Sequence, residues 1–182
     1  MDDLTHELKA GARILHRQAQ ARDTDALRRL HTLPELRDLD GAEIADRVRR
    51  RHCLAVIARE LGFDGWPQAA AVLRGDRDAT DFGTLLYPSG AAAHWNIWSA
   101  SYDEAKTIRA QHGGYLLAYK RHFFIVDRHF IETLGLDPED PDWEAIGRDW
   151  ARPKKVEARG RLYAKLIRQR SEPPKVPCLS PA

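Results

Sequence analysis

Two apolar runs lie close together in the sequence YLLAYKRHFFIV, which occupies residues 115–126. Aromatic and aliphatic side chains fill both runs, as in strands that are buried on at least one face. We therefore expect Tyr115–Tyr119 and Phe123–Val126 to form paired strands. The residues between them, Lys120, Arg121 and His122, make a poor tight turn, because none of them favours a positive φ. The pair nonetheless indicates a small antiparallel sheet.

The segment that precedes this pair predicts two more strands and a helix. Thr84–Tyr87 has the pattern of a short strand, and residues 93–100 have the pattern of a second strand rich in aromatic side chains. A helix over residues 102–112 follows, because Ser101 and Glu104 have the spacing of a capping box, in which two unpaired backbone N–H groups are satisfied.

The segment that follows the pair predicts helices. Asp127 can cap one helix that Gly135 ends, a short helix carries Trp143, and Pro153 begins the last helix. Residues 171–182 contain four prolines, and we expect them to be disordered. The last helix has a stripe of residues that we expect to be buried, Val156, Leu162, Tyr163, Leu166 and Ile167, and basic residues that we expect to cover the rest, Arg159, Arg161, Lys165 and Arg168.

The first 75 residues look helical throughout. Apolar residues recur at helical spacing near the N-terminus, and Thr24 can cap a second short helix. Asp40 and Glu43 have capping-box spacing, and the helix that they start is expected to run to about Leu61, with Gly62 ending it. The apolar face of the first helix consists of Leu4, Leu8, Ala12 and Leu15.

Together these patterns predict an α+β protein. An N-terminal helical segment, residues 1–75, would pack on a small antiparallel sheet flanked by helices, residues 76–170, and residues 171–182 would form the disordered tail. Because neither part alone has much core, we expect the two parts to form one structural unit.

The sequence VIARELGFDGWP, residues 56–67, resembles part of a short helical segment found ahead of ankyrin repeats in bacterial proteins. The resemblance covers about residues 10–75, and its most specific part is the Ala-Arg-Glu, Gly-Phe and Trp-Pro sequence. It implies a helical docking or capping unit and carries over no catalytic residues. After Gly75 the chain departs from such proteins, because no Thr-Pro-Leu-His-x-Ala pattern and no repeat of that period follows.

Length and composition are those of an ordinary globular protein. The 182 residues are 43% hydrophobic and 31% charged, with a formal net charge of +2, which is enough to build a core. No apolar run approaches the roughly 20 residues that cross a bilayer, and the N-terminus lacks the pattern of a signal peptide. Two cysteines make no disulfide framework. We expect a soluble cytoplasmic protein without membrane association.

The most suggestive stretch for ligand binding is HWNIW, residues 94–98. On a strand, Trp95 and Ile97 would point to one face, and an imidazole, an amide and an indole would share the other. That second face has the composition of a small-molecule pocket, in which the histidine can act as a general base. Alternatively, these polar groups satisfy one another in the core. The candidate ligand-binding residues are His94, Asn96, Trp98, Tyr87, Tyr119 and His122.

Metal and cofactor motifs are not found in the sequence. The eight histidines and two cysteines form no His-x-x-x-His, Cys-x-x-Cys or His-Glu-x-x-His pattern. No phosphate-binding glycine loop and no Gly-x-Ser-x-Gly elbow occurs. Cys53 lies in an apolar helix, where a thiol is normally inert. We therefore expect no metal and no cofactor, and no catalytic residue can be assigned.

The basic residues leave a nucleic-acid hypothesis open. Arg47, Arg50 and Arg51 cluster on one predicted helix, where they could bind phosphate oxygens. Residues 151–182 carry nine basic and two acidic side chains, whereas residues 81–150 carry six and eleven. The two charged segments would attract each other within the fold, or the basic end would bind an anionic partner.

Three functional hypotheses follow from these observations. The first is a non-catalytic protein- or ligand-binding module, because catalytic motifs are not found and the N-terminal segment resembles a docking unit. The second is a small enzyme or small-molecule sensor that uses the His, Asn and Trp face. The third is a nucleic-acid-binding regulator. The sequence names neither the partner nor the oligomeric state.

Overall fold

The computed structural model describes residues 2–76, 78–88, 91 and 94–171. This part of the chain combines helices with a three-stranded antiparallel sheet, and the predicted α+β class is confirmed. The helical elements before the sheet are α1 (Asp2–Gln20), α2 (Thr24–Leu30), the 3₁₀ helix η1 (Pro34–Leu36), α3 (Gly41–Arg47), α4 (Arg50–Glu60) and α5 (Trp66–Arg74). The remaining elements are β1 (Asn96–Ser99), α6 (Tyr102–His112), β2 (Tyr115–Tyr119), β3 (His122–Val126), α7 (Arg128–Thr133), α8 (Pro141–Ala145) and α9 (Val156–Ser171).

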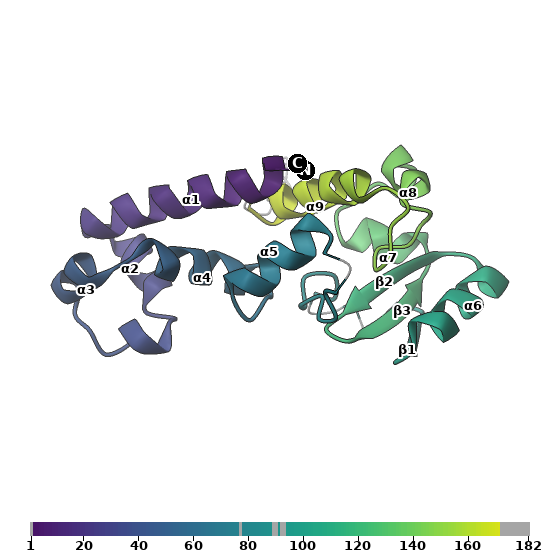
Figure 1. Cartoon of the computed structure of the whole chain (residues 1–182), viewed down its shortest axis with the longest axis horizontal. Coiled ribbons are helices and arrows are strands. Elements are labelled where there is room, and N and C mark those ends of the chain that lie inside the picture. Colours follow the sequence, from purple (N-terminus) through teal and green to yellow (C-terminus); the bar gives the residue numbers. More distant parts are fainter. Residues whose placement is uncertain (1, 77, 89–90, 92–93, 172–182) are drawn as a thin grey trace, which may run out of the picture.

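The molecule is elongated, with the N-terminal helices at one end and the sheet at the other (Figure 1). Helix α9, the last element in sequence, returns to the middle and packs against both α5 and α8. The predicted tail lies outside the described residues, apart from Ser171, which ends α9.

The N-terminal helices follow most of the local signals. The predicted apolar face of α1 points into the core, where Ala12 and Leu15 are fully buried. Asp40 caps α3 as expected, because its Oδ1 accepts from the Glu43 backbone N–H at 2.8 Å. The Glu43 side chain in turn accepts from the Asp40 backbone N–H at 3.0 Å. Helix α2 is capped by Asp23 rather than Thr24, one residue earlier than predicted.

The predicted long helix from Asp40 to Leu61 is in fact two helices. Val48 and Arg49 adopt extended backbone conformations between α3 and α4. The break is stabilised by His52, whose Nδ1 accepts a hydrogen bond from the Arg49 backbone N–H at 3.1 Å. An imidazole thus replaces the usual capping oxygen, and sequence rules for helix starts do not anticipate it.

The sheet has the strand order β1–β3–β2, so the predicted strand pair forms and β1 adds to its other edge. The register places Trp98 opposite Phe124, and Phe124 opposite Leu117. Helix α6 covers the other face, where Tyr102 meets the ring of Phe123 edge-on. Of the predicted strand over residues 93–100, residue 93 lies outside the described residues, and among the others only Asn96–Ser99 pairs.

Thr84–Tyr87 is not a strand but part of an irregular loop, which corrects the prediction. Its backbone bonds to a helix end and to the β2–β3 turn rather than to another strand: Thr84 N donates to Gly62 O at 2.8 Å, and Lys120 N donates to Gly83 O at 2.7 Å. Leu85 and Leu86 are nevertheless buried. Burial without strand pairing explains why this apolar run resembles a strand in the sequence.

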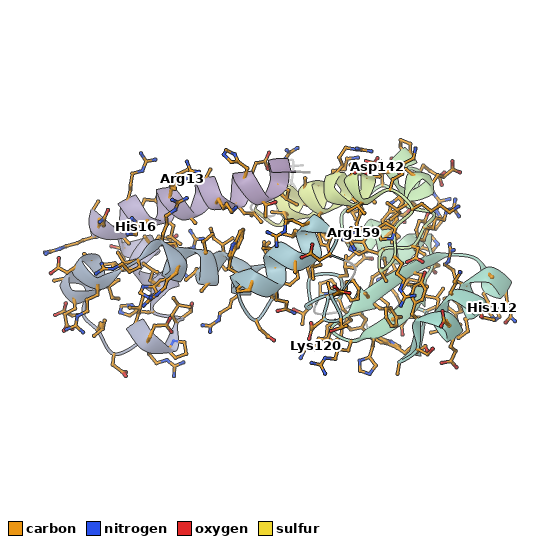
Figure 2. The ribbon with its side chains drawn as sticks, viewed as in Figure 1. Arg13, His16, His112, Lys120, Asp142 and Arg159 are labelled. Atoms are coloured by element: carbon orange, nitrogen blue, oxygen red, sulfur yellow. The ribbon has the colours of Figure 1, made fainter. Side chains whose placement is uncertain are left out.

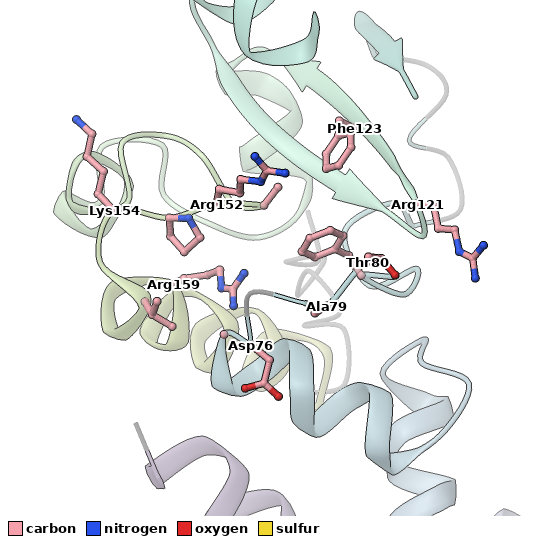
Figure 3. A pocket seen from close by; sticks show the side chains of 13 residues that line it. Asp76, Ala79, Thr80, Arg121, Phe123, Arg152, Lys154 and Arg159 are labelled. Atoms are coloured by element: carbon pink, nitrogen blue, oxygen red, sulfur yellow. The ribbon is translucent and has the colours of Figure 1, made fainter. Parts of the chain in front are cut away.

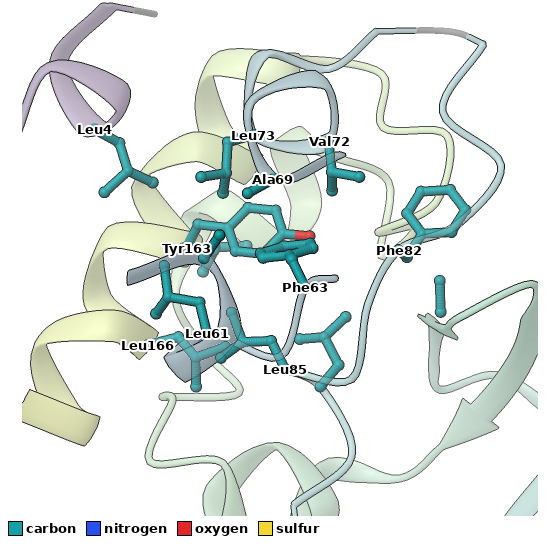
Figure 4. Packing of buried hydrophobic residues seen from close by; sticks show 14 of the residues in the cluster. Leu4, Leu61, Phe63, Ala69, Val72, Leu73, Phe82, Leu85, Tyr163 and Leu166 are labelled. Carbon is teal, nitrogen blue, oxygen red and sulfur yellow. The ribbon is translucent and has the colours of Figure 1, made fainter. Parts of the chain in front are cut away.

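A continuous hydrophobic cluster extends from the N-terminal helices into the sheet half. Figure 4 shows Tyr163 and Leu166 of α9 among Val72 of α5 and Leu61 and Phe63 of the segment between α4 and α5. Phe63 folds back beside the end of α4, where Gly62 has a φ of 79°, as the sequence predicts. Helix α9 begins at Val156, three residues after the predicted start at Pro153.

Candidate functional site

Three of the predicted ligand-binding residues meet in one aromatic cluster. The ring of Tyr87 lies 5.1 Å from that of Trp98 and 5.5 Å from that of Tyr119, in both cases edge to face. Trp98 stacks on Phe124 with ring centroids 4.7 Å apart. The loop and the three strands therefore bring these rings together, although Tyr87 does not belong to a strand.

The polar groups of this cluster bond mainly to one another. Asn96 Oδ1 accepts from Trp98 Nε1 at 2.8 Å, and Asn96 Nδ2 donates to the carbonyl oxygen of His94 at 2.9 Å. The Nε2 of His94 lies 3.0 Å from Thr133 Oγ1 on α7. His122 is exposed and makes no hydrogen bond or ring contact with the cluster in the described part of the chain. The geometry therefore favours mutual satisfaction, and a ligand-binding role stays a prediction.

The predicted nucleic-acid-binding arginines lie around the break between α3 and α4. Arg47 pairs with Glu43 at 3.6 Å, the Nε of Arg51 lies 3.2 Å from His52 Nε2, and Arg50 is exposed. One of the three positive charges is thus matched locally by a carboxylate. Nucleic-acid binding by these residues also stays a prediction.

A cavity of about 740 Å³ opens where the two halves of the molecule meet (Figure 3). Its walls come from the end of α5 and the following loop, from the start of β3 with the turn before it, and from the segment that leads into α9. The lining residues are Gly75, Asp76, Ala79, Thr80, Phe82, Arg121, Phe123, Ala151, Arg152, Pro153, Lys154, Val156 and Arg159.

Positive charge dominates the cavity lining. Four cations line it, Arg121, Arg152, Lys154 and Arg159, and none of them forms an ion pair with any residue that the structure describes. The lining contains one carboxylate, Asp76, which lies 3.6 Å from Arg74 outside the cavity. The cavity therefore attracts anions.

Arg159 is the buried member of this group, with 2% of its surface exposed. Its guanidinium donates from Nη2 to the carbonyl oxygen of Val72 at 2.8 Å and from Nη1 to that of Trp150 at 3.0 Å, while its buried Nε has no partner in the described structure. Carbonyl dipoles satisfy hydrogen bonds but leave the full positive charge without a counter-charge, which is costly at a buried position. Figure 2 places Arg159 between the N-terminal helices and the sheet half.

The close fit around Arg159 depends on Gly75, which ends α5 with a φ of 80°. A Cβ atom at this position would lie 2.3 Å from Cγ1 of Val156 and 3.2 Å from Nη2 of Arg159. The missing side chain thus lets the end of α5 approach the first turn of α9.

Arg152 is a second cation of the cavity lining, and Figure 3 shows its side chain above that of Arg159. Its guanidinium carbon lies 3.9 Å from the centre of the Tyr102 ring. Tyr102 in turn donates its hydroxyl to Asp149 Oδ2 at 2.6 Å, and Asp149 Oδ1 accepts from the Arg152 backbone N–H at 2.8 Å. Burial and the hydrogen bond to Asp149 raise the pKa of Tyr102 far above its usual range. The tyrosine therefore stays protonated and serves as a support for Arg152.

The other two cations lie at the rim. In Figure 3 the side chains of Arg121 and Lys154 extend away from the centre of the cavity. Arg121 follows Lys120 in the β2–β3 turn, and Lys154 lies against Gly147 with its Cε and Cδ atoms. Both are exposed, so they raise the positive potential at the entrance.

Sequence reasoning missed this cavity, and it wrongly assigned Arg159 to the exposed side of the last helix. A signal was present, because Arg159 precedes the buried Leu162, Tyr163 and Leu166 by three, four and seven residues and so shares their helical face. The predicted stripe was defined by hydrophobic residues alone, so the arginine was left out of it. The other lining residues are scattered through the chain, and no local pattern joins them.

Comparison of the chain with protein-family models, with curated proteins and with solved structures finds no match. The resemblance of residues 10–75 to a docking unit therefore stays a prediction. No group of three or more His, Cys, Asp or Glu side chains that could hold a metal ion occurs among the residues with a described position. Within the same residues, no helix is both long and apolar enough for a membrane span.

Proposed function

We propose that the protein is a non-catalytic ligand-binding module that holds a small anion in the cavity between its helical half and its sheet half. The observation that carries this proposal is the buried guanidinium of Arg159, which has two carbonyl partners and no carboxylate partner among the described residues. A bound anion supplies the counter-charge that the fold itself leaves out.

The remaining lining supports binding more than catalysis. Its one carboxylate, Asp76, lies 3.6 Å from Arg74, and its one hydroxyl, on Thr80, has no hydrogen bond to a base among the described residues. A nucleophile normally needs such a base within hydrogen-bond reach. A volume of about 740 Å³ lies within the range of small-molecule sites, roughly 300–1,000 Å³.

The test measures thermal unfolding and calorimetric binding with citrate, pyrophosphate, phenyl phosphate and 2-naphthoate. At least one of these anions is expected to raise the melting temperature, since a ligand that binds only the folded state stabilises it. Added sodium chloride should weaken the effect, because the entrance is exposed to solvent.

Charge variants locate the site. Arg152→Gln is expected to lower the affinity about tenfold, whereas the control Lys155→Gln, which removes an exposed charge three residues away that does not line the cavity, should change it less than twofold. Failure of all four anions to bind at millimolar concentration, or equal losses in both variants, would overturn the proposal.

A further inference from the structure

The apolar part of the cavity wall is aromatic and continuous. Phe82 and Phe123 line the cavity and meet edge to face, with ring centroids 6.2 Å apart and an interplanar angle of 66°. Phe123 also meets Tyr102 edge to face at 5.6 Å. Two rings, from a loop and a strand, thus form the aromatic wall, and Tyr102, which does not itself line the cavity, contacts Phe123 and supports the guanidinium of Arg152.

From this wall and the two arginines we infer that the ligand is an aromatic acid, a planar ring that carries an anionic group. This inference rests on the proposed function and adds the chemical class of the ligand. The anionic group faces the positive field of Arg159, and the ring lies against Phe82 and Phe123. Aromatic pairs that meet edge to face or offset gain stabilisation beyond the area that they bury, and a saturated ring lacks this gain.

Arg152 contributes to the same selectivity. A guanidinium is planar and stacks on aromatic faces. One face of this group lies over Tyr102, at 3.9 Å from the ring centre, and the side chain is exposed rather than buried. The opposite face of the guanidinium is therefore available to a planar ligand in the cavity, so Arg152 can both pair with an anionic group and stack on a ring.

A further part of the cavity lining is apolar and conformationally restricted. Pro153 and Val156 form it, and Pro153 has a backbone fixed by its own ring. The Val156 side chain fits against Gly75, where no Cβ is tolerated. A wall that moves little favours a flat ligand over a bulky one, because a saturated ring of the same carbon number is thicker.

The experiment compares 2-naphthoate with decahydronaphthalene-2-carboxylate by calorimetry on the full chain. The two acids have the same carbon skeleton and charge, and only one is planar and aromatic. We expect 2-naphthoate to bind about tenfold more tightly. The neutral 2-naphthamide should bind more weakly than 2-naphthoate, since it lacks the charge that Arg159 and Arg152 attract.

Variants assign the selectivity to the wall. Phe123→Leu, at a partly buried position, should reduce the preference for the aromatic acid to less than about threefold while citrate or pyrophosphate binding is retained. The control Phe124→Leu removes a ring that lies in the same strand but faces the other side of the sheet, and it should keep the preference.

The outcomes separate this inference from the proposed function. Equal affinities for the aromatic and the saturated acid, or tighter binding of the saturated acid, would overturn the aromatic assignment and leave anion binding standing. Binding of neither naphthoate nor any of the simple anions would overturn both. Loss of the preference in the Phe124→Leu control but not in Phe123→Leu would place the aromatic ring of the ligand on the other face of the sheet. This result would overturn the assignment to this cavity.

Discussion

Nη2 of Arg159 donates a hydrogen bond of 2.8 Å to the carbonyl oxygen of Val72, a residue 87 positions earlier in the chain. The bond joins α9 to the last turn of α5, and the second bond of the same guanidinium, to Trp150 O, ties in the segment that precedes α9. One buried side chain thus connects the helical half, the C-terminal helix and the cavity.

We predict that Arg159→Met destabilises the protein by about 2–4 kcal/mol, because the loss of two buried hydrogen bonds from a charged donor exceeds the gain from removing an unpaired buried charge. Urea denaturation followed by circular dichroism measures the change. The control is Arg168→Met in the same helix, whose side chain is 68% exposed and pairs with Glu7 at 3.5 Å. An exposed pair contributes only about 0–1 kcal/mol, so similar losses in both variants would contradict a clamping role for Arg159.

Elements whose ends are marked by residues close to them in the sequence could be predicted from the sequence. Helix α6 begins and ends at the predicted residues, because Ser101 Oγ accepts from the Glu104 backbone N–H and Gly113 ends the helix at a φ of 75°. The wrong predictions depended on distant partners. Leu85 and Leu86 are buried in a loop whose backbone bonds to a helix end and a turn rather than to a neighbouring strand, and no local pattern distinguishes a buried loop from a buried strand.

Lys120 illustrates a local rule that the structure violates. The sequence predicted a poor turn between β2 and β3, and Lys120 indeed adopts a φ of 49°, which is unfavourable for a residue with a side chain. Two backbone hydrogen bonds hold it there, from Phe82 N to Lys120 O at 2.9 Å and from Lys120 N to Gly83 O at 2.7 Å. The loop therefore offsets the strain of the turn.

We predict that Lys120→Gly stabilises the protein by about 1 kcal/mol, because glycine adopts a positive φ without steric cost. Urea denaturation again provides the measurement. Arg121→Gly is the matched control, since Arg121 occupies the next position of the same turn without a positive φ. It should lower stability or leave it unchanged. A loss of stability in Lys120→Gly would show that the side chain contributes more than the strain costs.

The candidate site was less predictable than the fold. Its cations come from a hairpin turn, a loop and a helix, and their convergence depends on how α9 packs against α5. The aromatic residues Tyr87, Trp98 and Tyr119 were correctly grouped, because strand alternation alone places two of them on one face of the sheet. The sequence left open whether the polar groups of this face bind a ligand or satisfy one another, and the hydrogen bond from the Trp98 indole to Asn96 favours the second alternative.

Asp142 fastens α8 to α9, and we predict that this contact fails in acid. Arg161 Nε donates to both carboxylate oxygens at 3.1 Å, and Lys165 Nζ donates to Oδ2 at 3.2 Å. The hydrogen bond from Arg161 lowers the pKa of Asp142 in the folded state. Its contribution is therefore complete above the unfolded pKa of about 4 and is lost as the pH falls below it through the folded pKa.

Denaturation of wild type and Asp142→Asn between pH 3 and pH 7 measures this contribution. At pH 7 the variant should be less stable by about 1 kcal/mol, a modest value because Arg161 is 58% exposed. The difference should shrink below pH 4. Glu144→Gln in the same helix removes an exposed carboxylate, and its stability should follow the wild type throughout. A difference between Asp142→Asn and wild type that is independent of pH would rule out the charge as its cause.

His52 caps α4 with Nδ1, and this arrangement requires the neutral imidazole, because a protonated Nδ1 cannot accept the Arg49 N–H. Burial and the nearby charge of Arg51 lower the pKa of His52 in the folded state. The unfolded chain therefore binds the proton more readily, with a pKa of about 6.5. By linkage, the His52 contribution to stability is complete above that value and declines as the pH falls through it toward the folded pKa.

We predict that the free energy of unfolding decreases between pH 7.5 and pH 5.5, and that His52→Gln makes this dependence shallower. A glutamine at this third helical position can still accept from the backbone of residue 49 but does not titrate. His112→Gln, which removes an exposed histidine at the end of α6, is the control and should retain the wild-type slope. Urea titrations at four pH values give the slopes. Identical slopes in His52→Gln and wild type would mean that His52 keeps the same proton affinity on folding, and the capping role would then have no pH-dependent part.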